Sequence, residues 1–161
     1  DSAPPSLAAS LGAPAGAVFV TCVVDDRSVG ESLREALDRA GVDVILDHDD
    51  APLAPRWEKR LKSALALSSA FVPVVSARSV NADRRFLQGE WVEAILEAGR
   101  AAPSGRFVLP VAIDDTAREG PAIPREFGDL KWERLPGGKP SSELVKTLIE
   151  LQRSYRRAKS A

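Results

Sequence analysis

The chain has 161 residues, which is enough for one domain with a substantial hydrophobic core. Its 22 basic and 23 acidic side chains give a net charge of −1, so charge provides no argument for binding nucleic acid or an anionic membrane surface. The single cysteine, Cys22, excludes an intrachain disulfide and fits a reducing compartment. No apolar run approaches the roughly 20 residues that cross a bilayer. We therefore expect a cytoplasmic globular protein without membrane or direct nucleic-acid partners.

Three parts are distinguishable by composition. Residues 1–16 are rich in Ala, Pro, Ser and Gly, and we expect a flexible linker that joins the domain to another module. Residues 17–157 carry the periodic apolar pattern of a folded domain, and residues 158–161 are expected to form a short C-terminal tail.

Apolar and amphipathic segments alternate along the chain. Residues 17–24 form an apolar run without polar alternation, which predicts a strand buried on both faces. Ser28 and Glu31 then form a capping-box pattern at the start of a helix that ends near Gly41. Further strands are predicted at residues 42–46, 70–76, 107–113 and 131–135, and further helices begin near residues 57, 86 and 144.

This alternation predicts an α/β fold with a parallel sheet and helices on both faces. The simplest solution is a flavodoxin-like, three-layer arrangement with five strands in the order 2-1-3-4-5. Pro110 lies inside the predicted fourth strand and removes one backbone donor, which indicates an edge or a bulge there.

Two acidic residues after the first strand are candidates for a phosphate-accepting site. Asp25 and Asp26 stand where a receiver domain keeps its acidic pair, but the third strand ends in Ser76 rather than an aspartate. No lysine ends a fifth strand, since Lys131 begins one. We therefore interpret Asp26 as a helix-start residue.

Metal and hydrolase chemistry are disfavoured by the motifs. Asp47-His48-Asp49-Asp50 are consecutive and rarely converge on one ion, so a solvated acidic loop is the preferred interpretation and no metal is expected. His48 is the only histidine, and neither a G-x-S-x-G elbow nor a phosphate-binding loop is present. Cys22 is better explained as a small buried side chain than as a nucleophile.

One carboxylate stands out by its position. Glu90 lies beside Trp91 at the flank of an apolar helical stripe, on the helix that follows the third strand. Ligands of open α/β sheets bind at the carboxyl edge of the strands, which is where that helix begins. A functional carboxylate and an ordinary solvated helix glutamate both remain open on this evidence.

Taken in order and spacing, several segments resemble a TIR (Toll/interleukin-1 receptor) domain of the bacterial type over roughly residues 17–155. The helix after the third strand carries the family's aromatic-x-x-x-Glu-Trp pattern at Phe86–Trp91. The other matching segments are Phe19–Cys22, Gly41–Asp47, Trp57–Leu61, Phe71–Ser76, Phe107–Asp115 and Ile123–Phe127.

The resemblance implies two functional classes. Many TIR domains cleave the nicotinamide–ribose bond of NAD⁺, giving ADP-ribose or a cyclic isomer, without a cofactor. In these enzymes the acting residue matches Glu90, and Trp57 is placed to stack on nicotinamide, with a core anchor as its equal alternative. The resemblance assigns substrate binding also to residues at three strand ends: Thr21, Cys22, Asp47 and Ser76.

Other members of the family are catalytically inactive scaffolds that act by homotypic self-association. The resemblance implies other TIR domains and a sensor domain as partners, with activation by oligomerisation, and a role in bacterial antiphage immunity. Thr21-Cys22 replaces the family's Ser-Tyr, and Ala54-Pro55 replaces a loop glycine. Because of these two departures from the family pattern, an inactive scaffold is the alternative to an enzyme.

Overall fold

The computed structural model describes residues 15–23, 26–49, 67–76, 96–97, 99–100, 107–114, 130 and 132–160. Residues 1–14 of the predicted linker lie outside this part. The described elements are β1 (Val18–Val23), α2 (Arg27–Arg39), β2 (Val44–Asp49), β3 (Ala70–Val75), β4 (Val111–Ala112), β5 (Glu133–Arg134), the 3₁₀ helix η2 (Pro136–Gly138) and α7 (Ser142–Ser160).

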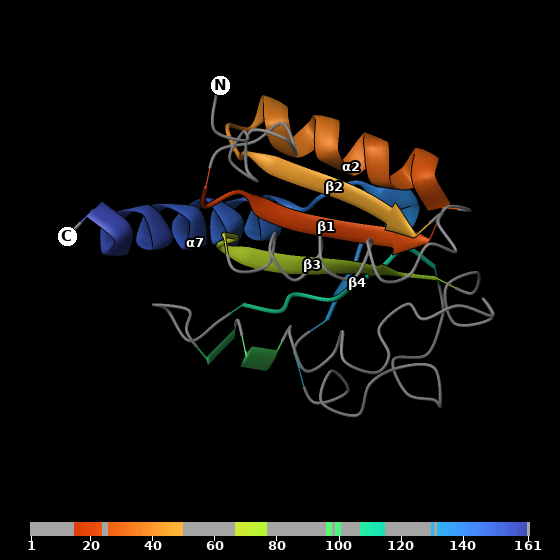
Figure 1. The fold of residues 1–161 in the computed structure, drawn as a ribbon. Helices are drawn as coiled ribbons and strands as arrows, with labels where there is room; N and C mark the ends of the chain where they lie inside the picture. Colours follow the sequence, from red (N-terminus) through yellow and green to blue (C-terminus); the bar gives the residue numbers. More distant parts are fainter. Residues whose placement is uncertain are drawn as a thin grey trace, which may run out of the picture.

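The strands form one five-stranded parallel sheet in the order β2-β1-β3-β4-β5. The predicted flavodoxin-like α/β fold is therefore confirmed. Figure 1 shows α2 alongside β2 and β1, and α7 running behind the sheet. None of the described helices is long and apolar enough to cross a membrane.

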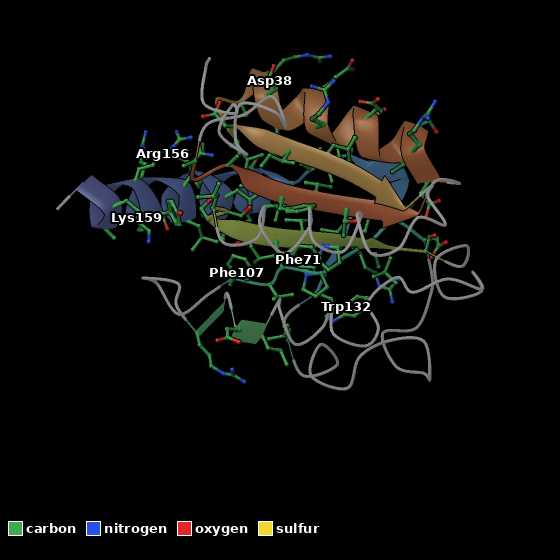
Figure 2. All side chains as sticks on the ribbon, in the orientation of Figure 1. Asp38, Phe71, Phe107, Trp132, Arg156 and Lys159 are labelled. Atoms are coloured by element: carbon green, nitrogen blue, oxygen red, sulfur yellow. The ribbon has the colours of Figure 1, made fainter. Side chains whose placement is uncertain are left out.

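Both faces of the interior strand β1 are buried, as its unbroken apolar pattern predicts. Val18, Val20 and Cys22 belong to one core cluster with leucines of α2 and α7. Phe19 alternates to the opposite face, where its ring packs edge-on against Phe71 at 5.8 Å between centroids. Figure 2 labels Phe71 and Phe107 among the side chains of the sheet. Residues 96–97 and 99–100 are helical, and Gly99 lies against Phe107.

The fourth strand is shorter than the predicted span of residues 107–113. Val108 forms only an isolated bridge with Phe71, and the regular ladder starts at Val111. Pro73 of β3 lies opposite this gap and has no N–H to donate to β4, which explains the interruption. The Pro110 carbonyl accepts from the Glu133 N–H, so Pro110 faces β5 instead. Because β4 lies between β3 and β5, Pro110 marks an interrupted interior strand and not the sheet's edge.

The second strand is displaced from its predicted span of residues 42–46. It runs from Val44 to Asp49, so the predicted acidic loop at residues 47–49 belongs to the sheet. There Asp47, His48 and Asp49 pair with Thr21, Cys22 and Val23 of β1. The prediction of a loop from side-chain polarity was wrong here. Backbone hydrogen bonds between strands do not depend on side-chain charge, and they extend β2 through these residues.

The start of α2 also differs from its predicted capping box. The helix begins at Arg27, so Ser28 lies inside its first turn and Asp26 occupies the N-cap position. Asp26 makes no side-chain capping hydrogen bond. The helix-start interpretation of Asp26 is thus right in position and wrong in mechanism, because its carboxylate is engaged across the sheet edge.

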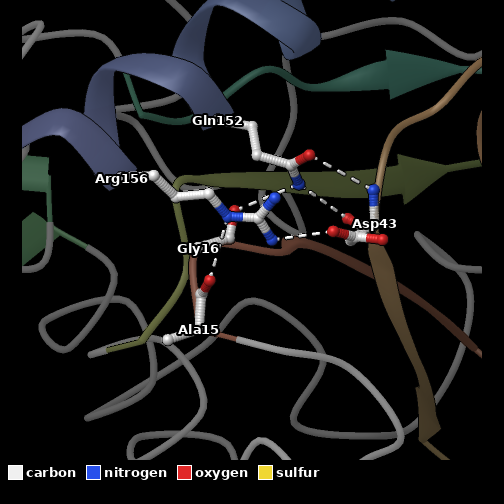
Figure 3. Close-up of polar contacts among 5 residues, drawn as sticks. All are labelled: Ala15, Gly16, Asp43, Gln152 and Arg156. Atoms are coloured by element: carbon white, nitrogen blue, oxygen red, sulfur yellow. Dashed lines mark hydrogen bonds and ion pairs between the residues drawn. The ribbon is translucent and has the colours of Figure 1, made fainter.

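A polar clasp closes the amino edge of the sheet, where β1 and β2 begin (Figure 3). The Gln152 amide of α7 donates to the carbonyl oxygens of Gly16 and Asp43 at 3.2 and 3.1 Å and accepts from the Asp43 N–H at 3.4 Å. Arg156 donates to the Ala15 carbonyl and forms an ion pair with Asp43 at 2.7 Å. Burial raises the pKa of the neighbouring Tyr155 phenol. The clasp fastens the chain entering β1 to the last helix.

The turn after β5 allows a matched stability test. Gly137 and Gly138 both have positive φ, +70° and +81°, but only Gly138 is crowded: a Cβ there would lie 2.5 Å from Val29 Cγ1 of α2. We expect Gly138→Ala to lower the free energy of unfolding by about 2 kcal/mol, from backbone strain plus overpacking. Gly137→Ala, with open space around it, should lose only about 1 kcal/mol. Urea denaturation measures both, and equal losses would contradict the packing of η2 on α2.

Candidate functional site at the carboxyl edge of the sheet

The strand order creates a switch point between β1 and β3. From β1 the chain continues through α2 to β2 on one side, and β3 lies on the other side. At such a point the connections leave in opposite directions, which opens a crevice at the carboxyl ends of the strands. Thr21 of β1 pairs with Asp47 of β2 and with Pro73 of β3, so these positions approach this edge together.

A buried polar pair spans the switch point. Asp26, which precedes α2, and Ser76, which follows β3, are each 2% exposed. The Ser76 hydroxyl donates to Asp26 Oδ2 at 2.5 Å. A charged acceptor makes this a stronger bond than a neutral pair, and it holds the ends of two adjacent strands together. Ser76, predicted to bind substrate, is thus at the predicted edge with its hydroxyl directed to Asp26.

The neighbours Thr21 and Cys22 point to opposite faces of the sheet. Cys22 is fully buried on the α2 side of the sheet. A Cβ added to Gly30 of α2 would lie 3.0 Å from the Cys22 sulfur. This placement confirms Cys22 as a small buried side chain. Thr21 is also fully buried, on the other face, and within the described part of the chain its Oγ1 has no hydrogen-bond partner. The two residues therefore cannot contribute to one face of a site.

The remaining predicted site residues are only partly covered by the structure. Asp47 has its backbone in β2, at the same edge as Thr21. Its side chain, Trp57 and Glu90 lie outside the described residues. Among the residues that the structure describes, no group of three or more His, Cys, Asp or Glu side chains could hold a metal ion.

Sequence reasoning missed the partnership of Asp26 with Ser76. The signal was present, since each follows a predicted strand and parallel strands end at a common edge. At the same edge Arg134 donates to the Asp114 carbonyl at 2.7 Å, joining the ends of β5 and β4.

Comparison with known families and structures gave consistent matches. The model of the TIR domain family matches residues 18–149. No curated protein matched the sequence.

Two solved structures have the same fold. The RPS4 and RRS1 TIR domain heterodimer superimposes with a TM-score of 0.54 at 18% identity, covering 88% of this chain and 99% of that chain. A metazoan TIR-STING receptor from C. gigas, in complex with 2′,3′-cGAMP, has a TM-score of 0.55 at 13% identity. That match covers 84% of this chain but only 38% of the receptor.

Proposed function

The chain belongs to the TIR domain family, and we propose that it is an NAD⁺ glycohydrolase or cyclase that uses Glu90 as its acting carboxylate. The observation that carries the proposal is the Phe86–Trp91 pattern, which supplies the glutamate of enzymatic members at the matching position. This segment follows β3, whose end at Ser76 lies at the switch point of the sheet.

The proposed reaction breaks the bond between C1′ of ribose and the ring nitrogen of nicotinamide. The bonding electron pair leaves with nicotinamide, whose ring becomes neutral, and the ribose passes through an oxocarbenium-like state. A carboxylate held beside the sugar stabilises the developing positive charge. Water attack at C1′ with loss of a proton gives ADP-ribose, and attack by a nitrogen of the adenine base gives a cyclic isomer.

The substrate contacts in this proposal follow the edge geometry. Trp57 would stack on the nicotinamide ring, and Asp47 would reach the sugar from the end of β2. Asp26 supports the site by holding Ser76 at the switch point. Cys22 is better assigned to packing under α2 than to contact with NAD⁺, because its sulfur lies on the opposite face from Thr21.

Thr21 offers a test of the substrate face. Replacing its unpartnered hydroxyl with a methyl group in Thr21→Val should leave the free energy of unfolding unchanged or slightly higher. If the hydroxyl serves NAD⁺, the KM should rise about fivefold, the equivalent of one hydrogen bond. The matched control is Ser69→Ala, which removes the other described buried hydroxyl without a partner, next to the amino edge. An unchanged KM in Thr21→Val would remove Thr21 from the site.

We propose that the domain is a cytoplasmic effector module, gathered by a sensor domain of a larger protein, in an antiphage system. Association of TIR domains has a structural parallel in the RPS4–RRS1 heterodimer, and attachment to a sensing module has one in the TIR-STING receptor. A pocket completed by a second copy would make NAD⁺ loss conditional on clustering.

Mass action then predicts that activity per molecule rises with protein concentration. Nicotinamide release measured across a broad dilution series, with and without a crowding agent, checks this. A specific activity that stays high and constant at concentrations where the protein is monomeric would contradict activation by clustering. Absence of release at every concentration would contradict NAD⁺ cleavage itself.

The second candidate function is a catalytically inactive scaffold. It is favoured by Ala54 and Pro55, which replace the family's loop glycine and narrow the backbone conformations open to that loop. Under this function the domain signals by self-association alone, and Glu90 has no role.

A further inference from the structure

Four exposed charges alternate in sign along α7 before a positive end at Arg157 and Lys159. Glu143, Lys146, Glu150 and Arg153 are all exposed. Their spacing of three, four and three residues places them on one stripe of the helix. We call these four residues the α7 stripe, and its signs run minus, plus, minus, plus.

The α7 stripe forms no ion pair with any residue in the part of the chain that the structure describes. On α2, four charged side chains at such spacings form two ion pairs, Arg34 with Glu31 at 3.2 Å and Arg39 with Glu35 at 3.8 Å. The stripe has the same spacings, but among the described residues none of its four side chains is within ion-pair distance of an opposite charge. Its charges are therefore available to an external partner.

The order of signs identifies a partner. An alternating pattern of four charges becomes its own complement when it is read in the reverse direction. Antiparallel contact with an identical helix sets Glu143 against Arg153 of the second copy and Lys146 against Glu150 of the second copy, with the same pairs repeated by symmetry. Both pairs are centred on position 148, so one two-fold axis at that level satisfies all of them.

We propose that two copies of this chain associate through an antiparallel, two-fold symmetric contact of their α7 stripes. The surface beside the stripe fits such a contact. A groove there is lined by Leu109, Leu144 and Thr147, together with the charged residues Glu133, Glu143, Lys146 and Glu150. An aliphatic arginine stem can lie along the apolar part while its guanidinium meets the carboxylates, and Arg153 of the second copy supplies that side chain.

Exposed ion pairs are individually weak and are screened by salt. The contact is therefore a low-affinity one, which forms when copies are concentrated and dissolves on dilution or at high ionic strength. It rests on the self-association within the proposed function, and it does not depend on NAD⁺ cleavage.

A charge-swap experiment on the full chain tests the contact. One double variant, Lys146→Glu with Arg153→Glu, makes the stripe entirely acidic, and the other, Glu143→Lys with Glu150→Lys, makes it entirely basic. Sedimentation velocity across a concentration series at low salt should show self-association of the wild type. Each double variant alone should associate at least tenfold more weakly, and their equimolar mixture should recover association at least as strong as that of the wild type.

The matched control is Arg27→Glu with Lys139→Glu, two exposed positions away from the stripe, which changes net charge as the acidic variant does. The control should associate as the wild type does. A wild type that stays monomeric, an acidic variant that associates normally, or a mixture that fails to recover would each overturn the α7 contact.

Nicotinamide release from the same samples separates this proposal from the proposed function. An acidic variant that associates as the wild type does, and releases nicotinamide at a rate that rises with concentration, overturns the contact and leaves NAD⁺ cleavage standing. Recovery of association in the mixture, without release in any sample, supports the contact and counts against the enzyme.

Discussion

Glu90→Gln is expected to lower the rate of nicotinamide release by about 100- to 1,000-fold, the effect of removing one electrostatic stabiliser of a transition state. The amide keeps the size and shape of the side chain but has no negative charge to set against the oxocarbenium-like ribose. Since the residue flanks an apolar stripe rather than filling it, the free energy of unfolding should change little. Initial rates at saturating NAD⁺, together with urea unfolding curves, measure the two effects separately.

Glu97→Gln is the matched control, because Glu97 is an exposed, helical glutamate seven residues further along the chain. Its release rate should equal that of the wild type. Equal background release by the wild type and Glu90→Gln would show that the enzyme proposal is wrong. Leu53→Asp, in the altered loop, tests the scaffold function. If the domain is a scaffold, Leu53→Asp abolishes self-association and signalling, whereas Glu90→Ala has no effect.

Gln152→Leu is expected to lower the free energy of unfolding by about 3 kcal/mol, because hydrogen bonds are lost and backbone polar groups are left without partners. Gln152 is 5% exposed, and its amide bonds the Gly16 carbonyl and both backbone groups of Asp43. Leucine fills a similar volume but offers no donor or acceptor. The Gly16 carbonyl and the Asp43 N–H lose these bonds, while the Asp43 carbonyl keeps the Val18 N–H.

Arg157→Leu, at an exposed position one turn further along α7, is the matched control and should change stability by less than about 0.5 kcal/mol. Thermal and urea unfolding of both variants give the comparison. A Gln152→Leu protein as stable as the wild type would show that the clasp is not needed to hold the start of β1 against the last helix.

The parallel sheet was predictable from the sequence because its signal is local. Residues 17–24 and 70–76 are apolar without alternation, as strands buried on both faces require, and amphipathic stretches separate the strands. Right-handed crossover connections then leave few possible strand orders, among them the observed one. The proposal of Glu90 rests on the same kind of local signal, a short pattern that follows β3, and stays a prediction.

Strand limits and polar partnerships were decided by the tertiary structure. β2 extends through Asp47–Asp49 because β1 lies alongside and provides backbone partners, which side-chain polarity does not report. Pro110 lies in the interior of the sheet and not at its edge because β5 pairs with β4 on the far side.

The sequence by itself determined the periodicity of this protein, and hence its fold class, its family resemblance and the position of Glu90. Only the tertiary structure decided that Asp26 bonds Ser76 instead of capping α2, and that Gln152 joins the starts of β1 and β2. The physical reason is range. Periodicity arises from neighbours within a few positions, whereas these bonds join groups 50 and 109 or more residues apart, which only the completed sheet brings within hydrogen-bond distance.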